Sequence, residues 1–321
     1  MSLTASEAET LFGQMLDGAM ADAAIADFLV AMADRGETPA EIVGAVRAMR
    51  ARMIAVAAPA NSIDVCGTGG DGQHSLNVST AVAIVVAACG VPVAKHGNRA
   101  ASSKAGGADT LEVLGLDLSR ASEMAEATLA DMGICFLFAQ KHHPALARIA
   151  PIRKALGRKT IFNLTGPLCN PAGVTRQLVG VANPDLIAVY RDAMSMLETE
   201  TALIVSGEEG LDELSIAGTS YMTSIGLPGI DTEIMPDRAG LSPHPLSALI
   251  GGDAAFNAAA LRRLLLGEQG AYRDAVLLNS AAALIVAGEV EDWLEGVEEA
   301  AEAIDKGLAN TLLDCWITAT R

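Results

Sequence analysis

The chain has 321 residues, enough for one large domain or two moderate ones, and in either case enough to bury a sizeable core. Apolar residues make up 51% and aromatic residues only 3%, which excludes a mainly disordered chain and predicts a core of Ala, Val, Leu and Ile. The 22 basic and 39 acidic residues give a net charge of −17, which argues against binding to nucleic acid or to an anionic membrane surface.

The five cysteines are widely spaced and include no C-x-x-C pair, which argues against both a disulfide framework and a structural zinc site. The N-terminal segment carries acidic residues where a signal peptide carries Lys or Arg. The longest apolar run, 81–94, contains Gly90 and Pro92 and is too short to cross a bilayer. We therefore expect a cytoplasmic protein.

Residues 1–60 are predicted to be helical throughout. Apolar residues recur at helical spacing within 11–15 and 25–32. Thr38 followed by Pro39 and by an acidic residue in the first turn predicts a helix start. Catalytic residue types are scarce here, so we expect a packing or assembly role. The apolar stripe suits a dimer surface, or packing against the rest of the same chain.

From residue 63 onward, short apolar runs end in Gly-rich turns and are followed by helical stretches. The predicted strands are 63–66, 91–94, 134–139, 178–182 and 202–206. Strands that alternate with helices indicate βαβ units and a parallel sheet, in which ligands bind at the carboxyl ends of the strands. The stretch 254–319 is predicted to be mostly amphipathic helix, with its acidic run 289–302 as a solvated face.

The first motif, GTGGDG at 67–72, directly follows a predicted strand and fits the pattern G-x-G-x-x-G. A dinucleotide site of this type needs an acidic residue at the end of the next strand, but that strand ends in a lysine and a histidine. The next helix opens through Asn77, Ser79 and Thr80, whose polar groups can join backbone N–H groups around a phosphate. We favour a phosphate or pyrophosphate cradle over an ordinary Gly-rich turn with an N-cap.

The second motif, KHGNRAASSKAGG at 95–107, gathers three cations, two serines and three glycines within an otherwise acidic protein. Glycines let the backbone approach a ligand, and Ser and Lys donate hydrogen bonds to anionic oxygens. His96 alone is weak evidence, because a lone histidine is more often structural. The loop as a whole predicts an anion-binding site.

The third motif, EEGLDE at 208–213, places four carboxylates within six residues after a predicted strand. Such carboxylates repel one another unless they are solvated or share a cation. Magnesium is commonly held by one or two carboxylates together with substrate phosphates. A solvated surface loop explains this stretch alone equally well.

The fourth stretch joins HHP at 142–144, PIRK at 151–154 and FNLTGPLCNP at 162–171. Adjacent histidines point in different directions, so they do not form a metal-binding pair. Arg153 suits a bidentate clamp on a carboxylate, although an arginine on a helix surface is the simpler interpretation. No nucleophile elbow, Walker A lysine motif, H-E-x-x-H motif or Ser/His/Asp arrangement is apparent.

These four stretches, in this order, resemble the anthranilate phosphoribosyltransferases of tryptophan biosynthesis. The resemblance rests on the GTGGD turn, the N-x-S-T helix start, K-H-G-N-R-x-x-S-S, H-P-A, F-N-x-x-G-P-L-x-N-P and G-L-D-E. It runs from about residue 63 to 213, and the helical ends also look like the family. It implies a glycosyltransferase that moves phosphoribosyl from phosphoribosyl pyrophosphate to the amine of anthranilate.

The resemblance implies a nucleoside phosphorylase-like α/β fold, with a small all-helical N-terminal domain hinged to a large α/β domain that has a mostly parallel sheet. The implied domains are 1–60, to which a return segment near 142–178 can contribute, and 61–321, which binds the phosphoribosyl donor. A homodimer formed through the helical part is also implied. The implied cofactor is Mg²⁺.

The resemblance also implies roles for individual residues. Catalysis is assigned to Lys95 and Asp71, anthranilate binding to Gly67, Asn98 and Arg153, and Mg²⁺ binding to Ser79, Asp212 and Glu213. The residues expected to hold phosphoribosyl pyrophosphate are Gly67, Gly70, Asp71, Ser75, Asn77, Val78, Ser79, Thr80, Lys95, His96, Gly97, Asn98, Arg99, Ala100, Ala101, Ser102, Ser103 and Gly107.

Three positions depart from the commonest family pattern, namely Ser206 for His, Gln140 for Pro and Cys169 for Thr, and none is assigned to chemistry. Two alternatives remain. A pyrimidine nucleoside phosphorylase shares the fold and the Gly-rich turn, but its basic loop differs from K-H-G-N-R. A non-catalytic nucleic-acid-binding paralogue fits poorly with the net charge of −17 and the intact Asp212-Glu213 pair.

Overall fold

The computed structural model describes residues 2–100 and 104–321. Its first three helices are α1 (Ala5–Leu16), α2 (Asp22–Arg35) and α3 (Pro39–Arg50). The predicted helix start at Thr38 is correct: its side chain accepts a hydrogen bond from the N–H of Glu41, and Pro39 occupies the first turn. Thr4 and Glu7 form the same reciprocal cap at the start of α1.

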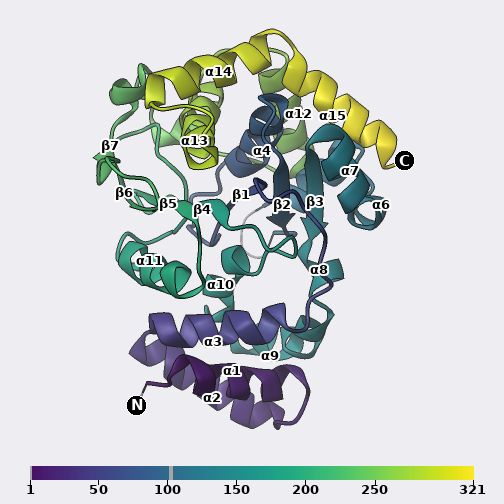
Figure 1. Cartoon of the computed structure of the whole chain (residues 1–321), viewed down its shortest axis with the longest axis vertical. Coiled ribbons are helices and arrows are strands. Elements are labelled where there is room, and N and C mark those ends of the chain that lie inside the picture. The colour runs from purple at the N-terminus through teal and green to yellow at the C-terminus, as the bar shows by residue number, and fades with distance from the viewer. Residues whose placement is uncertain (1, 101–103) are drawn as a thin grey trace.

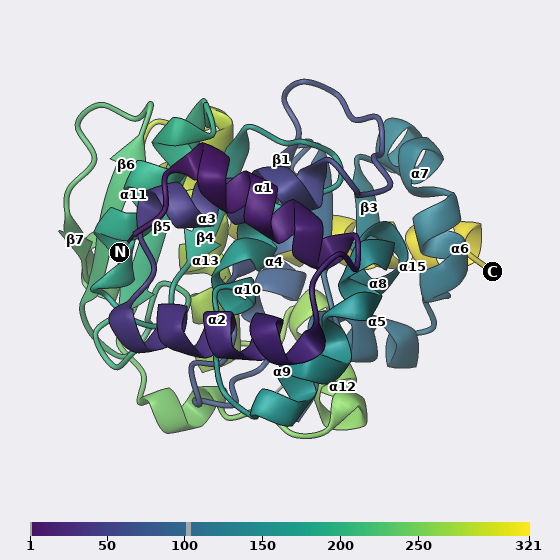
Figure 2. The ribbon, with the colours of Figure 1, turned by 90° about the horizontal axis from the view of Figure 1, so that it is seen from below.

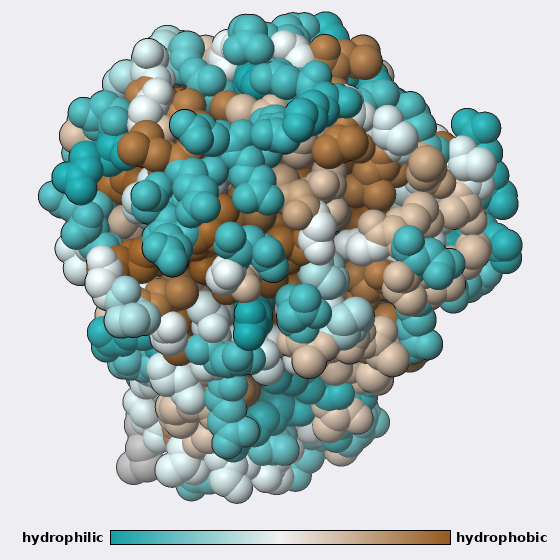
Figure 3. All heavy atoms as spheres, turned by 45° about the horizontal axis from the view of Figure 1, so that its top comes forward, coloured by the Kyte–Doolittle hydropathy of each residue, from teal (hydrophilic) through white to brown (hydrophobic). Residues whose placement is uncertain are grey.

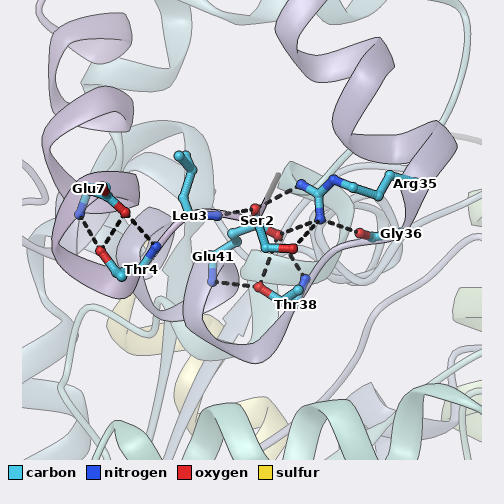
Figure 4. Close-up of polar contacts among 8 residues, drawn as sticks. All are labelled: Ser2, Leu3, Thr4, Glu7, Arg35, Gly36, Thr38 and Glu41. Carbon is cyan, nitrogen blue, oxygen red and sulfur yellow. Dashed lines mark hydrogen bonds and ion pairs between the residues drawn. The ribbon is translucent and has the colours of Figure 1, made fainter.

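A buried carboxylate, that of Glu41, joins the three helices (Figure 4). It accepts hydrogen bonds from the N–H groups of Leu3 (2.9 Å) and Thr38 (3.0 Å), and it pairs with the guanidinium of Arg35 at 2.7 Å. Desolvation opposes the charged form, but these bonds outweigh it and hold the pKa of Glu41 below its usual value. The start of the chain, the end of α2 and the start of α3 are thereby fixed together.

A seven-stranded sheet forms the centre of the molecule, in the order β3-β2-β1-β4-β5-β6-β7. The strands are β1 (Ile63–Gly67), β2 (Val93–Gly97), β3 (Ile134–Phe138), β4 (Arg176–Gly180), β5 (Thr201–Gly207), β6 (Ser220–Ile225) and β7 (Glu233–Ile234). The first five are parallel, as predicted, and each matches a predicted strand. The antiparallel strands β6 and β7 were not predicted, because the burial of β6 alternates only at its start and β7 has two residues.

Helices cover both faces of the sheet (Figure 1). They are α4 (Val78–Ala88), α5 (Gly107–Leu114), α6 (Leu118–Glu123), α7 (Ala125–Met132), α8 (Ala139–His142), α9 (Ala150–Leu156), α10 (Phe162–Thr165), α11 (Leu186–Met196), α12 (Ala254–Leu265), α13 (Ala271–Ala287), α14 (Trp293–Asp305) and α15 (Leu308–Ala319), with a 3₁₀ turn η2 at Gly166–Leu168. Val65 and Leu178 face the core shared with α4 and α13. Their neighbours Cys66 and Val179 face the opposite core. This alternation along each strand is the one expected of a sheet covered on both faces.

The opposite core is shared with the N-terminal helices, which lie beyond the carboxyl ends of the strands (Figures 1 and 2). Phe12 of α1 packs edge-on against Phe162 of α10, with ring centroids 5.7 Å apart. Ile149 and Ile152 belong to the same cluster, so residues from the 142–178 stretch pack with the first three helices. The apolar stripe of these helices is therefore buried largely against its own chain.

The far end of the molecule is formed by the C-terminal helices (Figure 1). Its surface mixes hydrophilic side chains with hydrophobic patches (Figure 3). In α14, Glu295, Glu298 and Glu302 are exposed whereas Ala300 and Ile304 are buried, so the acidic run is a solvated helix face as predicted. Within the described ranges, no helix has the length and apolar character needed to span a membrane.

Candidate active site

The sheet changes its winding direction at β1, which lies between β2 on one side and β4 on the other. In open α/β sheets, ligands bind outside the carboxyl ends of the strands at such a switch point. Here Gly67 ends β1, Gly180 ends β4, and the two residues are directly paired. The GTGGDG turn therefore begins at the place where the topology predicts a ligand.

Asp212 lies against this switch point, and both strand-ending glycines make room for it. A Cβ on Gly67 would lie 2.2 Å from Asp212 Oδ2, and one on Gly180 would lie 1.6 Å from the Asp212 carbonyl oxygen. The N–H of Gly69 donates to Asp212 Oδ2 at 2.7 Å. The first and third motifs, 143 residues apart, are thus in direct contact.

Three carboxylates, those of Asp71, Asp212 and Glu213, gather at this point. Desolvation, followed by repulsion from Asp71, raises the pKa of Asp212, and desolvation with repulsion from both neighbours raises the pKa of Glu213. Glu213 Oε1 accepts from the N–H of Ser79 at 3.1 Å, at the N-terminus of α4. Glu213 Oε2 and Asp71 Oδ2 are buried, and neither has a hydrogen-bond partner among the described residues. A surface loop would have solvated these oxygens, so the solvated-loop interpretation of this motif is wrong for Asp212 and Glu213.

This donor set fits a divalent cation that completes its coordination elsewhere. In the described part of the chain, no three His, Cys, Asp or Glu side chains are arranged to hold a metal ion by themselves. Magnesium typically takes one or two carboxylates and shares substrate phosphates and water for the rest. The unpaired oxygens of Asp71 and Glu213, the latter on a carboxylate that also accepts from the N–H of Ser79, match that pattern.

Asn77 holds the Gly-rich segments together through its own side chain. Its Oδ1 accepts from the hydroxyl of Thr110 at 2.5 Å and from Asn257 Nδ2 at 3.0 Å, while its Nδ2 donates to the carbonyl of Ala105 at 3.1 Å. Tyr272 donates to the Asn77 carbonyl at 3.1 Å. The Asn77 side chain, which was predicted to contact a ligand, thus already links the start of α4 to the second motif. Sequence reasoning missed Thr110, Asn257 and Tyr272, because single polar residues on distant helices carry no local pattern.

Other residues of the first motif are placed by neighbouring segments. Ser75 forms an isolated antiparallel bridge with Ile250, and Val78 is buried at the start of α4. Thr80 is buried with its hydroxyl facing Gly107, where a Cβ would lie 2.7 Å from Oγ1. The carbonyl of Gly70 accepts from Lys159 Nζ at 2.7 Å. Lys159 was not predicted, and it is an exposed cation at the edge of the Gly-rich turn.

Lys95 is almost fully buried near the carboxyl end of β2. Its ammonium donates to the carbonyl of Val65 at 2.8 Å, and attraction to Lys95 partly offsets the desolvation that raises the pKa of Asp64. Asp64 in turn accepts from the N–H of His96 at 3.1 Å and from Asn170 Nδ2 at 2.8 Å. This cation is therefore fixed in place beneath the switch point.

The rest of the basic loop turns toward α5. Arg99 pairs with Asp109 (2.9 Å) and Glu112 (2.8 Å), and its guanidinium lies 5.7 Å from the ring centroid of Phe138. Asp109 also accepts from the N–H groups of Ala100 and Gly106, both at 2.9 Å. Arg99 is thus engaged by acidic residues of α5 and not by the Asp71, Asp212 and Glu213 cluster. It lines a surface hollow of about 420 Å³ together with Glu112, Asp117, Phe138 and Lys141. Ala101, Ser102 and Ser103 lie outside the described residues.

His96 and His143 face each other next to this loop, with ring centroids 5.2 Å apart. Desolvation, with repulsion from His143 and Lys95 as lesser causes, lowers the pKa of His96 to about 3. Desolvation and the charge of His142 lower the pKa of His143 to about 4. Both rings are therefore neutral at pH 7. Gly97, which follows His96, packs against the Phe136 ring, where a Cβ would lie 2.7 Å from a ring carbon.

Arg153 has no carboxylate partner among the residues that the structure describes. Its guanidinium lies 5.6 Å from the ring centroid of Phe162 and 3.4 Å from Asn163 Oδ1, and burial lowers its pKa. Twelve of the other arginines form ion pairs within 4.0 Å, so this half-buried cation is unusual in the molecule. A ligand carboxylate could form an ion pair with Arg153.

Asn98, the other residue predicted to face the acceptor, is exposed. Its Oδ1 accepts from the N–H of Arg99 at 2.8 Å and from Gln140 Nε2 at 3.4 Å. Gln140 is one of the three departures from the commonest pattern, so this departure does touch a residue assigned to substrate binding. Within residues 2–100 and 104–321 the Asn98 Nδ2 group makes no hydrogen bond, so it is available as a donor to a ligand.

Comparisons with known proteins agree with this geometry. Residues 59–310 match the "Glycosyl transferase family, a/b domain", and residues 1–53 match the "Glycosyl transferase family, helical bundle domain". The anthranilate phosphoribosyltransferase of Novosphingobium aromaticivorans is 65% identical over 318 residues, covering 99% of this chain and 96% of that one. This chain belongs to the anthranilate phosphoribosyltransferase family.

Solved structures support the assignment and the predicted fold class. The Thermus thermophilus anthranilate phosphoribosyltransferase superposes with a TM-score of 0.93 at 41% identity, covering 100% of this chain and 97% of that one. The Saccharomyces cerevisiae enzyme, solved in complex with PRPP and Mg, gives a TM-score of 0.90 at 27% identity, covering 99% and 93%. The predicted fold, a helical N-terminal domain with a large α/β domain, is therefore confirmed, and the chain is a glycosyltransferase-family enzyme.

Proposed function

We propose that this chain transfers the phosphoribosyl group of 5-phosphoribosyl 1-pyrophosphate to the amine of anthranilate, forming N-(5-phosphoribosyl)anthranilate and pyrophosphate. The observation that carries this proposal is the cluster of Asp71, Asp212 and Glu213 at the β1/β4 switch point, with unpaired buried oxygens beside the N-terminus of α4. The cluster needs a cation, and the helix N-terminus favours an anion, so a magnesium-bound pyrophosphate satisfies both.

The proposed donor site lies between the two Gly-rich motifs. Backbone N–H groups of 67–72 and the start of α4 would face the phosphates, with the Ser79 hydroxyl, Asp212 and Glu213 holding Mg²⁺. When bound, this ion would neutralise negative charge that develops on the leaving pyrophosphate. Lys95 would add a fixed buried positive charge, preorganised by the Val65 carbonyl so that it does not reorient during the reaction.

The proposed acceptor site is built on Arg153, Asn98 and the two neutral imidazoles. Arg153 would clamp the carboxylate of anthranilate, which supplies the missing ion-pair partner. An aromatic amine presents N–H donors, and the unpaired Nε2 atoms of His96 and His143 would accept them in the tautomer that carries its proton on Nδ1. Their low pKa values make them weak bases, which suits an amine that is already neutral at pH 7 and attacks without prior deprotonation.

In this proposal, catalysis is mainly positioning and charge stabilisation. Breaking the bond from ribose C1 to pyrophosphate leaves positive charge on the sugar and negative charge on the leaving group. Holding the amine close to C1 converts a bimolecular encounter into an intramolecular step. Closure of the crevice would exclude the water that competes for C1.

The direct test mixes the protein with Mg²⁺, phosphoribosyl pyrophosphate and anthranilate and follows the loss of anthranilate fluorescence. We expect loss that requires all three and stops when EDTA is added. Replacing anthranilate by uracil or thymine, and the donor by phosphate with a nucleoside, tests the nucleoside phosphorylase alternative. Folded protein that consumes no anthranilate would overturn the proposal.

We further propose that the enzyme is a cytoplasmic homodimer. The homodimer rests on the resemblance to the family, because the apolar stripe that suggested a dimer surface is largely buried within one chain. Light scattering at micromolar concentration tests it. A stable, active monomer would remove the dimer.

A further inference from the structure

The carboxylates of Asp212 and Glu213 are carried by a loop that has no regular structure of its own. Residues 208–219, between β5 and β6, belong to no helix or strand. No ladder of backbone hydrogen bonds therefore fixes the main chain at the point where two like charges are brought together. Other parts of the molecule must hold this loop in place.

The residue that follows the carboxylate pair, Leu214, is held by one side chain from α13. Its N–H donates to Asn279 Oδ1 at 2.9 Å, and its carbonyl accepts from Asn279 Nδ2 at 3.0 Å. The second hydrogen of Nδ2 is donated to the Ala275 carbonyl at 2.9 Å, one turn earlier on α13. An amide is needed for this arrangement, because it must accept from an N–H and donate to two carbonyls at once.

Asn279 is an unusual residue for its position in α13. Apart from its neighbour Ser280, the stretch 275–287 is wholly apolar, and Asn279 is only 3% exposed. Asparagine is a poor helix former, and a buried amide is costly unless it is hydrogen-bonded. An apolar residue here would suit the helix better but would remove both bonds to the buried main chain of Leu214. The asparagine therefore serves the loop and not the helix.

The same loop is also held at the carboxylates themselves. The N–H of Gly69 donates to Asp212, and the N–H of Ser79 donates to Glu213. Asn279 lines the same small cavity as Ser79, Asp212 and Glu213. Because α13 packs against β1, β4 and β5, it offers this cavity a rigid wall.

We propose that Asn279 is a positioning residue for the carboxylates of Asp212 and Glu213. By holding both backbone groups of Leu214, it fixes the main chain directly after the pair, so that the two carboxylates stay at the switch point despite their repulsion. It acts through the loop and touches neither substrate. This inference rests on the proposed function for the identity of the ligand, magnesium pyrophosphate, that the carboxylates receive.

The test compares Asn279→Leu with Ser280→Ala. Leucine is close to asparagine in size but forms no hydrogen bond. Ser280 is the next residue of α13, and its buried hydroxyl has no hydrogen-bond partner among the described residues, so its loss is a matched control. By titration calorimetry with magnesium pyrophosphate, we expect the Kd to rise about tenfold in Asn279→Leu, as for one or two lost hydrogen bonds. Ser280→Ala should leave it unchanged. The KM for anthranilate should change less than about twofold in both variants, because Arg153 lies on other elements.

A combined variant separates positioning from a general loss of packing. On the background Asp212→Asn/Glu213→Gln, the further change Asn279→Leu should raise the Kd less than about twofold, because the charges that it positions are already gone. A structural effect that does not pass through the carboxylates would raise the Kd about tenfold on this background too.

A further readout needs no ligand. In EDTA, the N–H of Leu214 should exchange with deuterium at least about tenfold faster in Asn279→Leu than in Ser280→Ala, because its acceptor is lost. If Asn279→Leu does not fold, Asn279→Ser, which keeps one hydroxyl, carries the same measurements.

The outcomes distinguish this proposal from the proposed function. An unchanged Kd in folded Asn279→Leu, unchanged exchange at Leu214, or the full rise in Kd on the neutralised background would overturn the positioning role alone. Failure of the unsubstituted protein to bind magnesium pyrophosphate would instead overturn the proposed function.

Discussion

The carboxylate of Asp212 occupies the space that a side chain at Gly67 would need, because a Cβ there would lie 2.2 Å from Oδ2. This contact joins the turn after β1 to the acidic loop after β5, and the Gly69 N–H bond to the same oxygen reinforces it. The glycine at 67 is thus required by a close approach, since its φ is not in the left-handed region. The two motifs can form one site only because residue 67 has no side chain.

Gly67→Ala should therefore disrupt the carboxylate cluster without unfolding the core. We expect Asp212 to be pushed away and kcat/KM to fall about 100-fold or more, equivalent to about 2.7 kcal/mol of lost charge stabilisation. Steady-state kinetics with a magnesium titration checks this. Gly218→Ala is the matched control, because its Cβ would meet only Glu208, at 3.8 Å. Equal activity of the two variants would contradict the expectation.

Neutralising Asp212 and Glu213 should lower activity without lowering the stability of the folded protein. In Asp212→Asn/Glu213→Gln we expect a higher magnesium requirement and turnover lower by about 100-fold or more. In EDTA the same variant should be at least as stable as the unsubstituted protein, because the repulsion that raises both pKa values is gone. Thermal unfolding and a magnesium titration measure the two effects. Glu208→Gln, an exposed change in the same loop, is the control, and an unchanged titration in the folded double variant would remove the assignment.

The paired imidazoles predict a stability that depends on pH. The folded pKa values of His96 and His143, about 3 and about 4, lie below the unfolded value of about 6.5. The unfolded state therefore binds more protons between these limits. The stabilisation is complete above pH 6.5 and is lost as the pH falls toward 4 and then 3, at up to about 1.4 kcal/mol per pH unit for each ring.

The measurement is urea unfolding of the protein and of His143→Gln between pH 4 and pH 7. The variant should lose one ring's share of the slope below pH 6.5, whereas His74→Gln, a change at an exposed histidine, should keep the full slope. Parallel curves for the unsubstituted protein and His143→Gln would mean that His143 is not held neutral in the folded state.

Local patterns were sufficient to predict the parallel strands and the Gly-rich turns. Strands β1 and β2 each end at a glycine and β3 is wholly apolar, so these strands are recognised as short buried segments and not by alternation. Strand β6, which lies between β5 and β7, alternates only at its start in burial, and the edge strand β7 has two residues, so neither carries a readable pattern. The early helices were predicted correctly, but their apolar stripe could not show whether it faces its own chain or a second copy.

The site could be predicted as a set of motifs but not as a set of contacts. Asp212 is a candidate ligand from its loop alone, yet its approach to Gly67 joins residues that only the fold brings together. Asn77 was predicted to bind the donor, whereas its amide is engaged by Thr110, Asn257 and Ala105. Asn279 carries no motif at all, because the backbone groups it holds lie 65 residues away.

Arg153 gives the sharpest distinction between a surface residue and a substrate-binding one. As a surface residue, its change to Ala would alter stability by less than about 0.5 kcal/mol and leave kinetics unaffected. As the clamp on the anthranilate carboxylate, its loss removes a charge-assisted hydrogen bond of about 1.5–3 kcal/mol, or about 10–150-fold in apparent affinity. The unpaired guanidinium beside Phe162 favours the second outcome.

The loss should appear in the KM for anthranilate and leave that for phosphoribosyl pyrophosphate nearly unchanged, because the donor is held by the Gly-rich motifs. Arg153→Lys should restore only part of the affinity, since an ammonium cannot reproduce the planar fork. Anthranilate methyl ester lacks the carboxylate charge, so its KM should differ little between Arg153→Ala and the unsubstituted protein. Equal changes in the KM values of both substrates would mean that Arg153 positions the crevice as a whole. No change in either KM would mean that Arg153 is a surface residue with no role in binding.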